Sequence, residues 1–514
     1  MPLGFTYGPS IQAMLTDAST PDGGSSGSLF ALGVPSDPSL VQLTIGGVPA
    51  TVTLAGPASI SSPPAYPFPV SKVSFTTPPG SGGAADVVLT TSNGSTTLKD
   101  GFHYATSAQD FAAPVSGTTY RALLYNSKRN ELYLSGGDHV DIFSTSSSAF
   151  VHSITSSALT GKLLGGMAVS PDGNTLYITD TSDGLLLVAN LSSLSSSLVS
   201  IPVATATQAN GCLVGPLSVA VTSDSKAYVA YGTISLNHCS NLGNSAYYRV
   251  DLQTSIVTTP SFLSSNCEGN FAASSDGTKL AMTPIGGTGF FCIYDVNGGQ
   301  IHKLDSTSPG FNLGASATGG TISADGTRVA FEGGPVVATS AGNVVNFSHT
   351  PEAYAIPNFP LTNVKLTDNG SLVYVLYPKN LDIFDANHGT LRRRITFTET
   401  AQSALDSLAI DPSGQHAYAI TDTGLLVITL DAVPLSASEM QPASGSPGTS
   451  VTVHGNGFTN QTTGTLNGTS VPLIFTDDNT LTLTIPASAS GMQTLNLANA
   501  DGQTYTLGAA FSVN

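Results

Sequence analysis

The sequence is poor in charge, and the charge that it has is mostly negative. Only 10% of the 514 residues are charged, and 33 acidic residues outnumber 16 lysines and arginines, which gives a net charge of −17. Such a chain repels phosphate backbones and anionic lipid surfaces, because they carry charge of the same sign. We therefore expect no nucleic acid among its partners.

Long apolar runs and tryptophan are also missing. No run of about 18 or more apolar residues occurs, so we expect no membrane span in this chain. Trp is absent, although 17 Tyr and 21 Phe leave stacking on sugar rings open. The opening stretch MPLGFTYGPS lacks the basic and apolar regions of a secretory signal.

Motifs for catalysis and cofactor binding are scarce. The chain has no calcium loop, His-Glu-x-x-His, Cys-x-x-Cys or phosphate loop, so we expect no metal and no cofactor. Residues 23–27, GGSSG, match the nucleophile elbow Gly-x-Ser-x-Gly, but that elbow needs a strand-to-helix turn and this is a Gly/Ser loop. A Ser-x-x-Lys match at 223–226 belongs to the repeated turn described next.

What the sequence has in abundance is one repeated turn. Residues 170–178, SPDGNTLYI, join the end of one apolar strand to an apolar-Tyr-apolar strand through Asp-Gly, which suits a hairpin. Equivalent turn residues follow at intervals of 44 to 52 residues, namely Lys128, Asp172, Asp224, Asp276, Asp325, Asn369 and Ser413. Seven repeats of four short strands predict a seven-bladed β-propeller, with a solenoid as the alternative.

The seventh repeat predicts how the ring closes. It yields only three strands before residue 431, while residues 110–115 precede the first repeat without a partner of their own. We expect this early segment to supply the outer strand of the last blade, because pairing them removes two free edges.

The repeats resemble the bacterial surface-layer-type propellers of the YVTN family, whose blades carry the Ser-Pro-Asp-Gly…Tyr-Val turn. The resemblance covers about residues 107–432 and implies a β-propeller. Propellers of this kind include lactonases, dehydrogenase subunits and plain binding platforms, so the resemblance does not select one activity.

Short alternating strands separated by Gly, Pro and Asn-Gly flank the repeats and predict two small β-sandwiches. Both resemble IPT/TIG domains, immunoglobulin-like modules of bacterial surface proteins and secreted enzymes, through the Gly-Asn-Gly-Phe motif at 455–458 and the aromatic end strand at 101–104. The first copy departs from the motif at residues 33–35, GVP. We therefore expect an all-β chain with four parts. Residues 1–8 are the tail of a preceding IPT/TIG repeat, 9–106 form a sandwich, 107–432 form the propeller and 433–514 form a second sandwich. The chain is then a piece of a longer protein.

Four cysteines fall within one 81-residue stretch. An even, clustered count favours two disulfides and hence a secreted or cell-surface protein, with four buried thiols as the alternative. Equal placement in blades three and four predicts Cys212–Cys239 and Cys267–Cys292, each closing a loop of about 25 residues worth roughly 3 kcal/mol. The rival pairing joins Cys239 to Cys267.

The mouth of the propeller, where the innermost strands begin, is the expected binding site. Counting back from each turn gives two rings of mostly small and polar residues. The candidate ligand-binding residues are Arg121, Ser218, Glu268, Asn270, Asn363, Asp406 and Ser407. Arg121 and Asp406 fall on neighbouring blades, which predicts a salt bridge across the closing seam or, alternatively, part of a ligand site.

No histidine falls in either ring, and acid-base catalysis near neutral pH usually needs a histidine or paired carboxylates. We therefore favour an extracellular or cell-surface binding or adhesion protein that contacts a glycan or a protein through the propeller face. The alternatives are a secreted enzyme, lactonase-like or polysaccharide-cleaving, and a structural subunit of a surface layer or filament.

Overall fold

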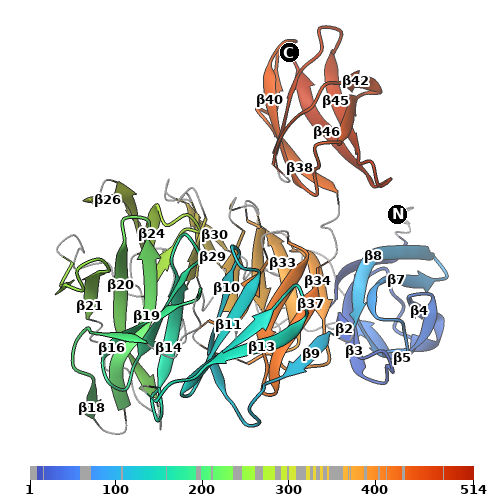
Figure 1. Ribbon diagram of the computed structural model, residues 1–514. Helices are drawn as coiled ribbons and strands as arrows, with labels where there is room; N and C mark the ends of the chain where they lie inside the picture. Colours follow the sequence, from blue (N-terminus) through green and yellow to red (C-terminus); the bar gives the residue numbers. More distant parts are fainter. Residues whose placement is uncertain are drawn as a thin grey trace.

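A computed structural model shows an all-β chain arranged as three bodies (Figure 1). The residues that it describes are 8–14, 17–57, 71–105, 108–157, 159–192, 198–209, 212–235, 246–260, 270–283, 291–297, 300–307, 320–323, 328–331, 336–339, 344–346, 363–367, 370, 372–386, 391–402, 404, 406–411, 414–430, 435–477 and 480–514. Among these residues, the single helical element is a short 3-10 turn, η1 (Pro38–Leu40). No described helix is long and apolar enough to cross a membrane.

The N-terminal body is an immunoglobulin-like sandwich. Its strands hydrogen-bond in the order β1-β3-β6-β5-β4-β7-β8-β2, and β5 pairs on both edges, so that it passes from one layer to the other. The strands are β1 (Ser10–Met14), β2 (Ala18–Ser19), β3 (Ser26–Leu32), β4 (Gln42–Ile45), β5 (Val48–Pro57), β6 (Ser71–Thr76), β7 (Gly83–Thr91) and β8 (Gly94–Tyr104). Leu29, Phe75, Val87 and Phe102 are buried together between the layers, because alternate residues of each strand point inward.

The central body contains seven sheets in the described residues, and each is a row of antiparallel strands. Neighbouring sheets contact each other through their first strands, and β35 contacts β10, so the sheets form a closed ring of propeller blades. We number the blades one to seven in the order of their first strands. These innermost strands are β10 (Tyr120–Asn126), β14 (Leu164–Val169), β19 (Cys212–Thr222), β23 (Asn270–Ala273), β27 (Gly320–Ile322), β31 (Asn363–Leu366) and β35 (Leu408–Ile410).

The other strands of each blade follow outward in chain order. The second strands are β11 (Glu131–Gly136), β15 (Thr175–Asp180), β20 (Lys226–Ser235), β24 (Lys279–Thr283), β28 (Arg328–Phe331), β32 (Leu372–Leu376) and β36 (His416–Ile420). The third strands are β12 (His139–Ser144), β16 (Leu185–Asn190), β21 (Tyr247–Asp251), β25 (Phe291–Asn297), β29 (Val336–Thr339), β33 (Asn380–Asp385) and β37 (Gly424–Thr429). The outer strands of blades one to six are β13 (Ala149–Ile154), β17 (Val199–Pro202), β22 (Val257–Thr258), β26 (Gln300–Thr307), β30 (Val344–Asn346) and β34 (Leu391–Thr396), and blade three has an additional strand, β18 (Thr207–Ala209).

The predicted closure of the ring is confirmed. The early strand β9 (Gln109–Ala112) pairs antiparallel with β37 and completes blade seven. Phe111 of β9 packs edge-on against Phe143 of blade one, with ring centroids 4.9 Å apart. The seam is therefore held by a ladder and by a shared apolar core.

The C-terminal body is a second sandwich of two sheets, β38-β40-β44-β43 and β39-β46-β45-β41-β42. Its strands are β38 (Ser436–Gln441), β39 (Ser444–Gly445), β40 (Ser450–Asn456), β41 (Thr463–Leu466), β42 (Thr469–Val471), β43 (Ile474–Asp477), β44 (Thr480–Thr484), β45 (Gly491–Ala498) and β46 (Thr504–Val513). Val453, Leu481, Leu495 and Phe511 are buried between the sheets. Figure 1 shows this body standing away from the propeller, whereas the N-terminal sandwich lies against it.

Candidate functional site

The candidate residues that the structure describes lie on or next to the innermost strands. Arg121 is the second residue of its strand, and Asn270 and Asn363 are the first residues of theirs. Ser218 lies in the second half of β19, which begins six residues earlier at Cys212. Asp406 and Ser407 immediately precede β35. Glu268 lies outside the described residues, as do Cys239 and Cys267, so the two disulfide pairings stay predictions.

A β-bulge marks this level of the propeller in blades one to three. In blade one, Tyr120 pairs with Gly136 and Ala122 pairs with Ser135, which leaves Arg121 as the extra residue. The register shifts at the same level in β14 and β19. Bulges bend a strand and change the direction of the side chain that they carry. Arg121 is therefore set apart from the regular ladder by the backbone itself.

Between blades two and four, small and polar residues serve the contact between blades. A Cβ on Gly166 would lie 3.0 Å from the carbonyl oxygen of Leu217, so glycine permits the close approach of two innermost strands. Ser218 Oγ donates a hydrogen bond to Asn270 Oδ1 at 3.1 Å. These polar groups therefore satisfy each other within the ring.

The predicted salt bridge between Arg121 and Asp406 is wrong. The two blades do meet at this point, because Ala122 bridges to Asp406 and the Leu123 N–H donates to the Asp406 carbonyl oxygen at 2.7 Å. The Asp406 carboxylate, however, pairs with Lys365 Nζ of blade six at 2.7 Å. Lys365 lies two residues after Asn363 on β31. Because residues i and i+2 of a strand point to the same face, this spacing could have identified Lys365 from the sequence.

The charges at this seam do not balance among the described residues. Burial raises the pKa of Asp406 above its ordinary value of 3.8, although Lys365 opposes the shift. Burial lowers the pKa of Arg121, and no described carboxylate lies within ion-pair distance of its guanidinium. The starts of β10, β31 and β35 thus bring together two cations and one carboxylate.

Asn363 adds an unusual polar group to the same seam. Its side chain is fully buried, and neither Oδ1 nor Nδ2 has a hydrogen-bond partner among the residues that the structure describes. Such a group costs roughly 1–3 kcal/mol of stability, and it is uncommon unless the site has a use for it. Asn363 and Lys365 share one face of β31, so both lie toward the Asp406 side of the strand.

A buried polar cluster in blade one was not anticipated from the sequence. Asp141 accepts hydrogen bonds from Tyr120 Oη, at 2.5 Å, and from Ser153 Oγ, and His139 Nε2 lies 3.3 Å away. The serine contacts the carboxylate and not the histidine, so the arrangement is not that of a catalytic triad. Burial, aided by the contact with Asp141, raises the pKa of Tyr120. The cluster therefore links strands β10, β12 and β13 of blade one through hydrogen bonds to Asp141.

The other motifs fall in structural positions. Ser25 immediately precedes strand β3 and is not followed by a helix, so GGSSG is not a nucleophile elbow. No group of three or more His, Cys, Asp or Glu residues in the described ranges is placed to hold a metal ion.

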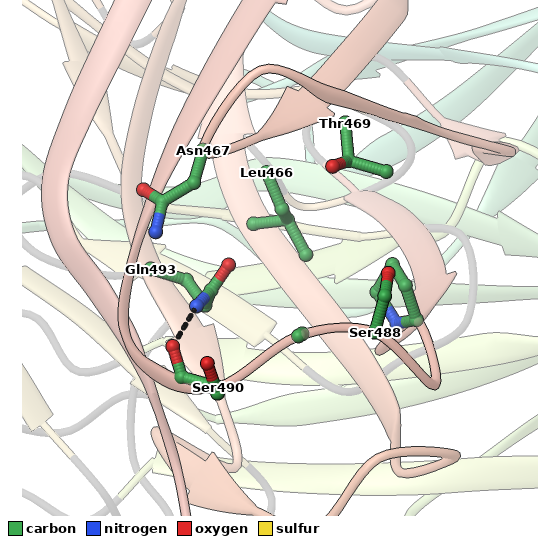
Figure 2. A pocket seen from close by; sticks show the side chains of 8 residues that line it. Leu466, Asn467, Thr469, Ser488, Ser490 and Gln493 are labelled. Atoms are coloured by element: carbon green, nitrogen blue, oxygen red, sulfur yellow. Dashed lines mark hydrogen bonds between the residues drawn. The ribbon is translucent and has the colours of Figure 1, made fainter.

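A cavity of about 190 Å³ lies in the C-terminal sandwich (Figure 2). It is lined by Leu466, Asn467, Thr469, Pro486, Ser488, Ala489, Ser490 and Gln493. Gln493 Nε2 donates to the Ser490 carbonyl oxygen at 2.7 Å, and Asn467 Nδ2 donates to the Met492 carbonyl oxygen at 3.0 Å. These two amide donors fix the conformation of the loop around the cavity, and none of the eight described lining residues is charged.

Comparison with known proteins gives a family for one part of the chain. Residues 435–513 match the IPT/TIG domain, and this range contains β38 to β46. No curated protein matches the chain. The C-terminal sandwich is therefore an IPT/TIG domain.

Several solved structures resemble the chain over about three fifths of its length. One is hydrazine synthase of Kuenenia stuttgartiensis, with a TM-score of 0.46 and 14% identity over 63% of this chain and 98% of that one. Another is the β-propeller domain of Myceliophteria thermophila Cps50 (Swd1), with a TM-score of 0.45 and 12% identity over 63% of this chain and 99% of that one. A third is a functionally unknown protein from Desulfotomaculum acetoxidans DSM 771, with a TM-score of 0.41 and 14% identity over 61% of this chain and 92% of that one. At this level of similarity, the three proteins say nothing about what this chain binds.

Proposed function

We propose that this chain is an extracellular or cell-surface binding protein that contacts its ligand at the mouth of the propeller. The observation that carries the proposal is the seam between blades six, seven and one, where Arg121, Lys365, Asp406 and Asn363 gather. A charged side chain without an opposite charge among the described residues is typical of a binding site, because a ligand can supply that charge.

The proposal includes an organisation of the chain. We infer a seven-bladed propeller of the YVTN type at 107–432, with IPT/TIG sandwiches at 9–106 and 433–514 as spacers. Clustered cysteines, few lysines and the IPT/TIG match at 435–513 support export. The pairs Cys212–Cys239 and Cys267–Cys292 remain part of this proposal, and peptide mapping without reduction distinguishes them from the cross-blade rival.

A binding screen with matched variants tests the proposal. The full chain is applied to arrays of extracellular glycans and surface proteins, and each hit is measured again with Arg121→Gln and Lys365→Met. The control is Lys226→Met, which removes a similar ion pair with Asp251, 2.8 Å long, at the other end of a blade. We expect the mouth variants to weaken binding at least about tenfold. Hits that all persist in both mouth variants would show that the contact surface lies elsewhere.

A further inference from the structure

We propose that the ligand of the mouth carries a carboxylate, which binds Arg121, and that it belongs to the class of acidic saccharides. This inference rests on the proposed function, because it names the ligand class of the same site. It starts from the charges that the three blades contribute.

Asp406 cannot serve both cations. Its carboxylate contacts Lys365, while the backbone beside Arg121 contacts only the Asp406 main chain. A partly buried guanidinium without a counter-ion is unfavourable, because burial removes water without replacing it by an opposite charge. A ligand group with one negative charge would balance the two cations and the one carboxylate at this seam.

The guanidinium favours a flat, singly charged group. Its planar fork matches a carboxylate through two parallel hydrogen bonds. A phosphate would match the fork as well, but its second negative charge would meet Asp406 and a chain with a net charge of −17. The carboxylate is thus the better anion for this seam.

The neighbouring groups favour hydroxyls on the rest of the ligand. The side chains of Lys365 and Asp406 remain 23% and 36% exposed, so an ammonium donor and a carboxylate acceptor are both accessible. Asn363 lies on the same face of β31, but its side chain is fully buried, so Lys365 and Asp406 are the groups that can contact the ligand. A sugar acid combines one carboxylate with adjacent hydroxyls, which is the combination that these groups can bind.

The test is calorimetric titration of the full chain with trigalacturonate and, as the neutral counterpart, with galactotriose. We expect trigalacturonate to bind and the neutral sugar to bind at least tenfold more weakly. Arg121→Gln should remove most of that preference, Arg121→Lys should restore part of it, and Lys226→Met should leave it unchanged.

Thermal unfolding gives a second readout that does not depend on activity. Without ligand, Arg121→Met should raise the melting temperature by a degree or more, because it removes an uncompensated cation. Trigalacturonate should raise the melting temperature of the original chain and not that of the variant.

The outcomes separate the two proposals. Equal binding of both sugars, lost in Lys365→Met, would overturn the carboxylate inference and leave binding at the mouth intact. Binding of glucose 6-phosphate in preference to trigalacturonate would overturn it in favour of phosphate. Failure of trigalacturonate to bind overturns the acidic-saccharide class, and only hits that are insensitive to every mouth variant overturn the proposed function.

Discussion

Asp406 links three blades through two kinds of contact. Its main chain pairs with blade one, where Leu123 N–H donates to its carbonyl oxygen at 2.7 Å, and its carboxylate contacts Lys365 of blade six. Protein surrounds the carboxylate closely enough to raise its pKa, yet 36% of its side chain meets solvent, so solvent partly screens the pair.

This arrangement predicts an asymmetry between the two partners. Lys365→Met leaves a partly buried carboxylate without its cation and should lower the free energy of unfolding by about 1 kcal/mol at neutral pH, allowing for screening. In an Asp406→Asn background, the same change should cost close to nothing. Urea unfolding of the four proteins measures the coupling. The matched cycle with Arg121→Met and Asp406→Asn should be additive, and additivity in the Lys365 cycle would refute the pair.

Because the pKa of Asp406 is raised, the loss of stability caused by Lys365→Met should depend on pH. The folded state holds the proton more tightly than the unfolded chain, whose carboxyl titrates near 3.8, so the charged form lowers stability above the folded pKa. Below pH 3.8, Asp406 is neutral in both states and the cost of Lys365→Met should vanish. Unfolding curves collected from neutral to acid pH test this, and a constant cost over the range would contradict it.

At the scale of the element, the repeated turn between first and second strands is the local unit that builds each blade. In blade two, the Gly173 N–H donates to the Ser170 carbonyl oxygen at 2.8 Å, and Gly173 has a positive φ of 75°. Asp172 Oδ1 accepts hydrogen bonds from Ser170 Oγ, at 2.5 Å, and from the Asn174 N–H, at 3.1 Å. The predicted roles of Gly and Asp in this turn are confirmed.

Glycine at 173 is required for two reasons that a matched pair of variants can separate. A Cβ there would lie 2.5 Å from Lys128 Cβ and would also adopt an unfavourable φ, so Gly173→Ala should cost roughly 2–4 kcal/mol. Gly161 has a similar φ of 73° with nothing within 4 Å, so Gly161→Ala should cost only about 1 kcal/mol. Equal losses of stability by chemical denaturation would show that φ alone decides.

Asp172 should make the turn sensitive to acid. The Ser170 hydroxyl and the Asn174 N–H donate to its carboxylate and lower its pKa below 3.8. Its contribution is therefore complete above pH 3.8 and is lost as the pH falls through the lower folded value. Asp172→Asn should cost under about 1 kcal/mol at neutral pH, because the group is exposed. Thermal unfolding near pH 3 should show a smaller difference, and a larger one would contradict the assignment.

At the scale of the whole molecule, one arginine fixes the N-terminal sandwich to the ring. Arg394 of β34 contacts Asp17 of the sandwich and also pairs with Asp382 of β33 at 2.6 Å. Strand β8 contacts β34 beside this cluster, and Figure 1 shows the sandwich next to the outer strands of blades six and seven. Arg394 is 9% exposed, so the contact is shielded from salt and water.

Removing this arginine should loosen the sandwich. Arg394→Met leaves Asp382, which is 1% exposed, without its cation and breaks the contact to Asp17. We expect a larger radius of gyration in small-angle scattering and faster cleavage by protease near residue 106. Asp17→Asn should show a weaker effect, and Asp22→Asn, an exposed carboxylate of the same sandwich, should show none. Unchanged scattering of Arg394→Met would mean that the strand contacts alone fix the orientation.

The sequence by itself determined the all-β class, the turns within the blades and the closure of the ring by β9. These features depend on residues that are close in the chain, on the two-residue period of strands and on the need to pair an open edge. Gly173 and Asp172 show the reason, because the hydrogen bonds that form the turn itself, from the Gly173 N–H to Ser170 and from the Ser170 hydroxyl to Asp172, join residues within three positions of each other.

Only the tertiary structure decided which charges meet. Asp17 and Arg394 are 377 positions apart, and Asp406 takes Lys365 in preference to Arg121 although both belong to neighbouring blades. No local sequence pattern predicts which of these charges pair. The pairing depends on how the blades pack, on the bulge that places Arg121 outside the ladder, and on how deeply each side chain is buried in the closed ring. The sequence placed the candidate residues on or next to the innermost strands, and the packing of three blades decided which of the charged groups pair with each other.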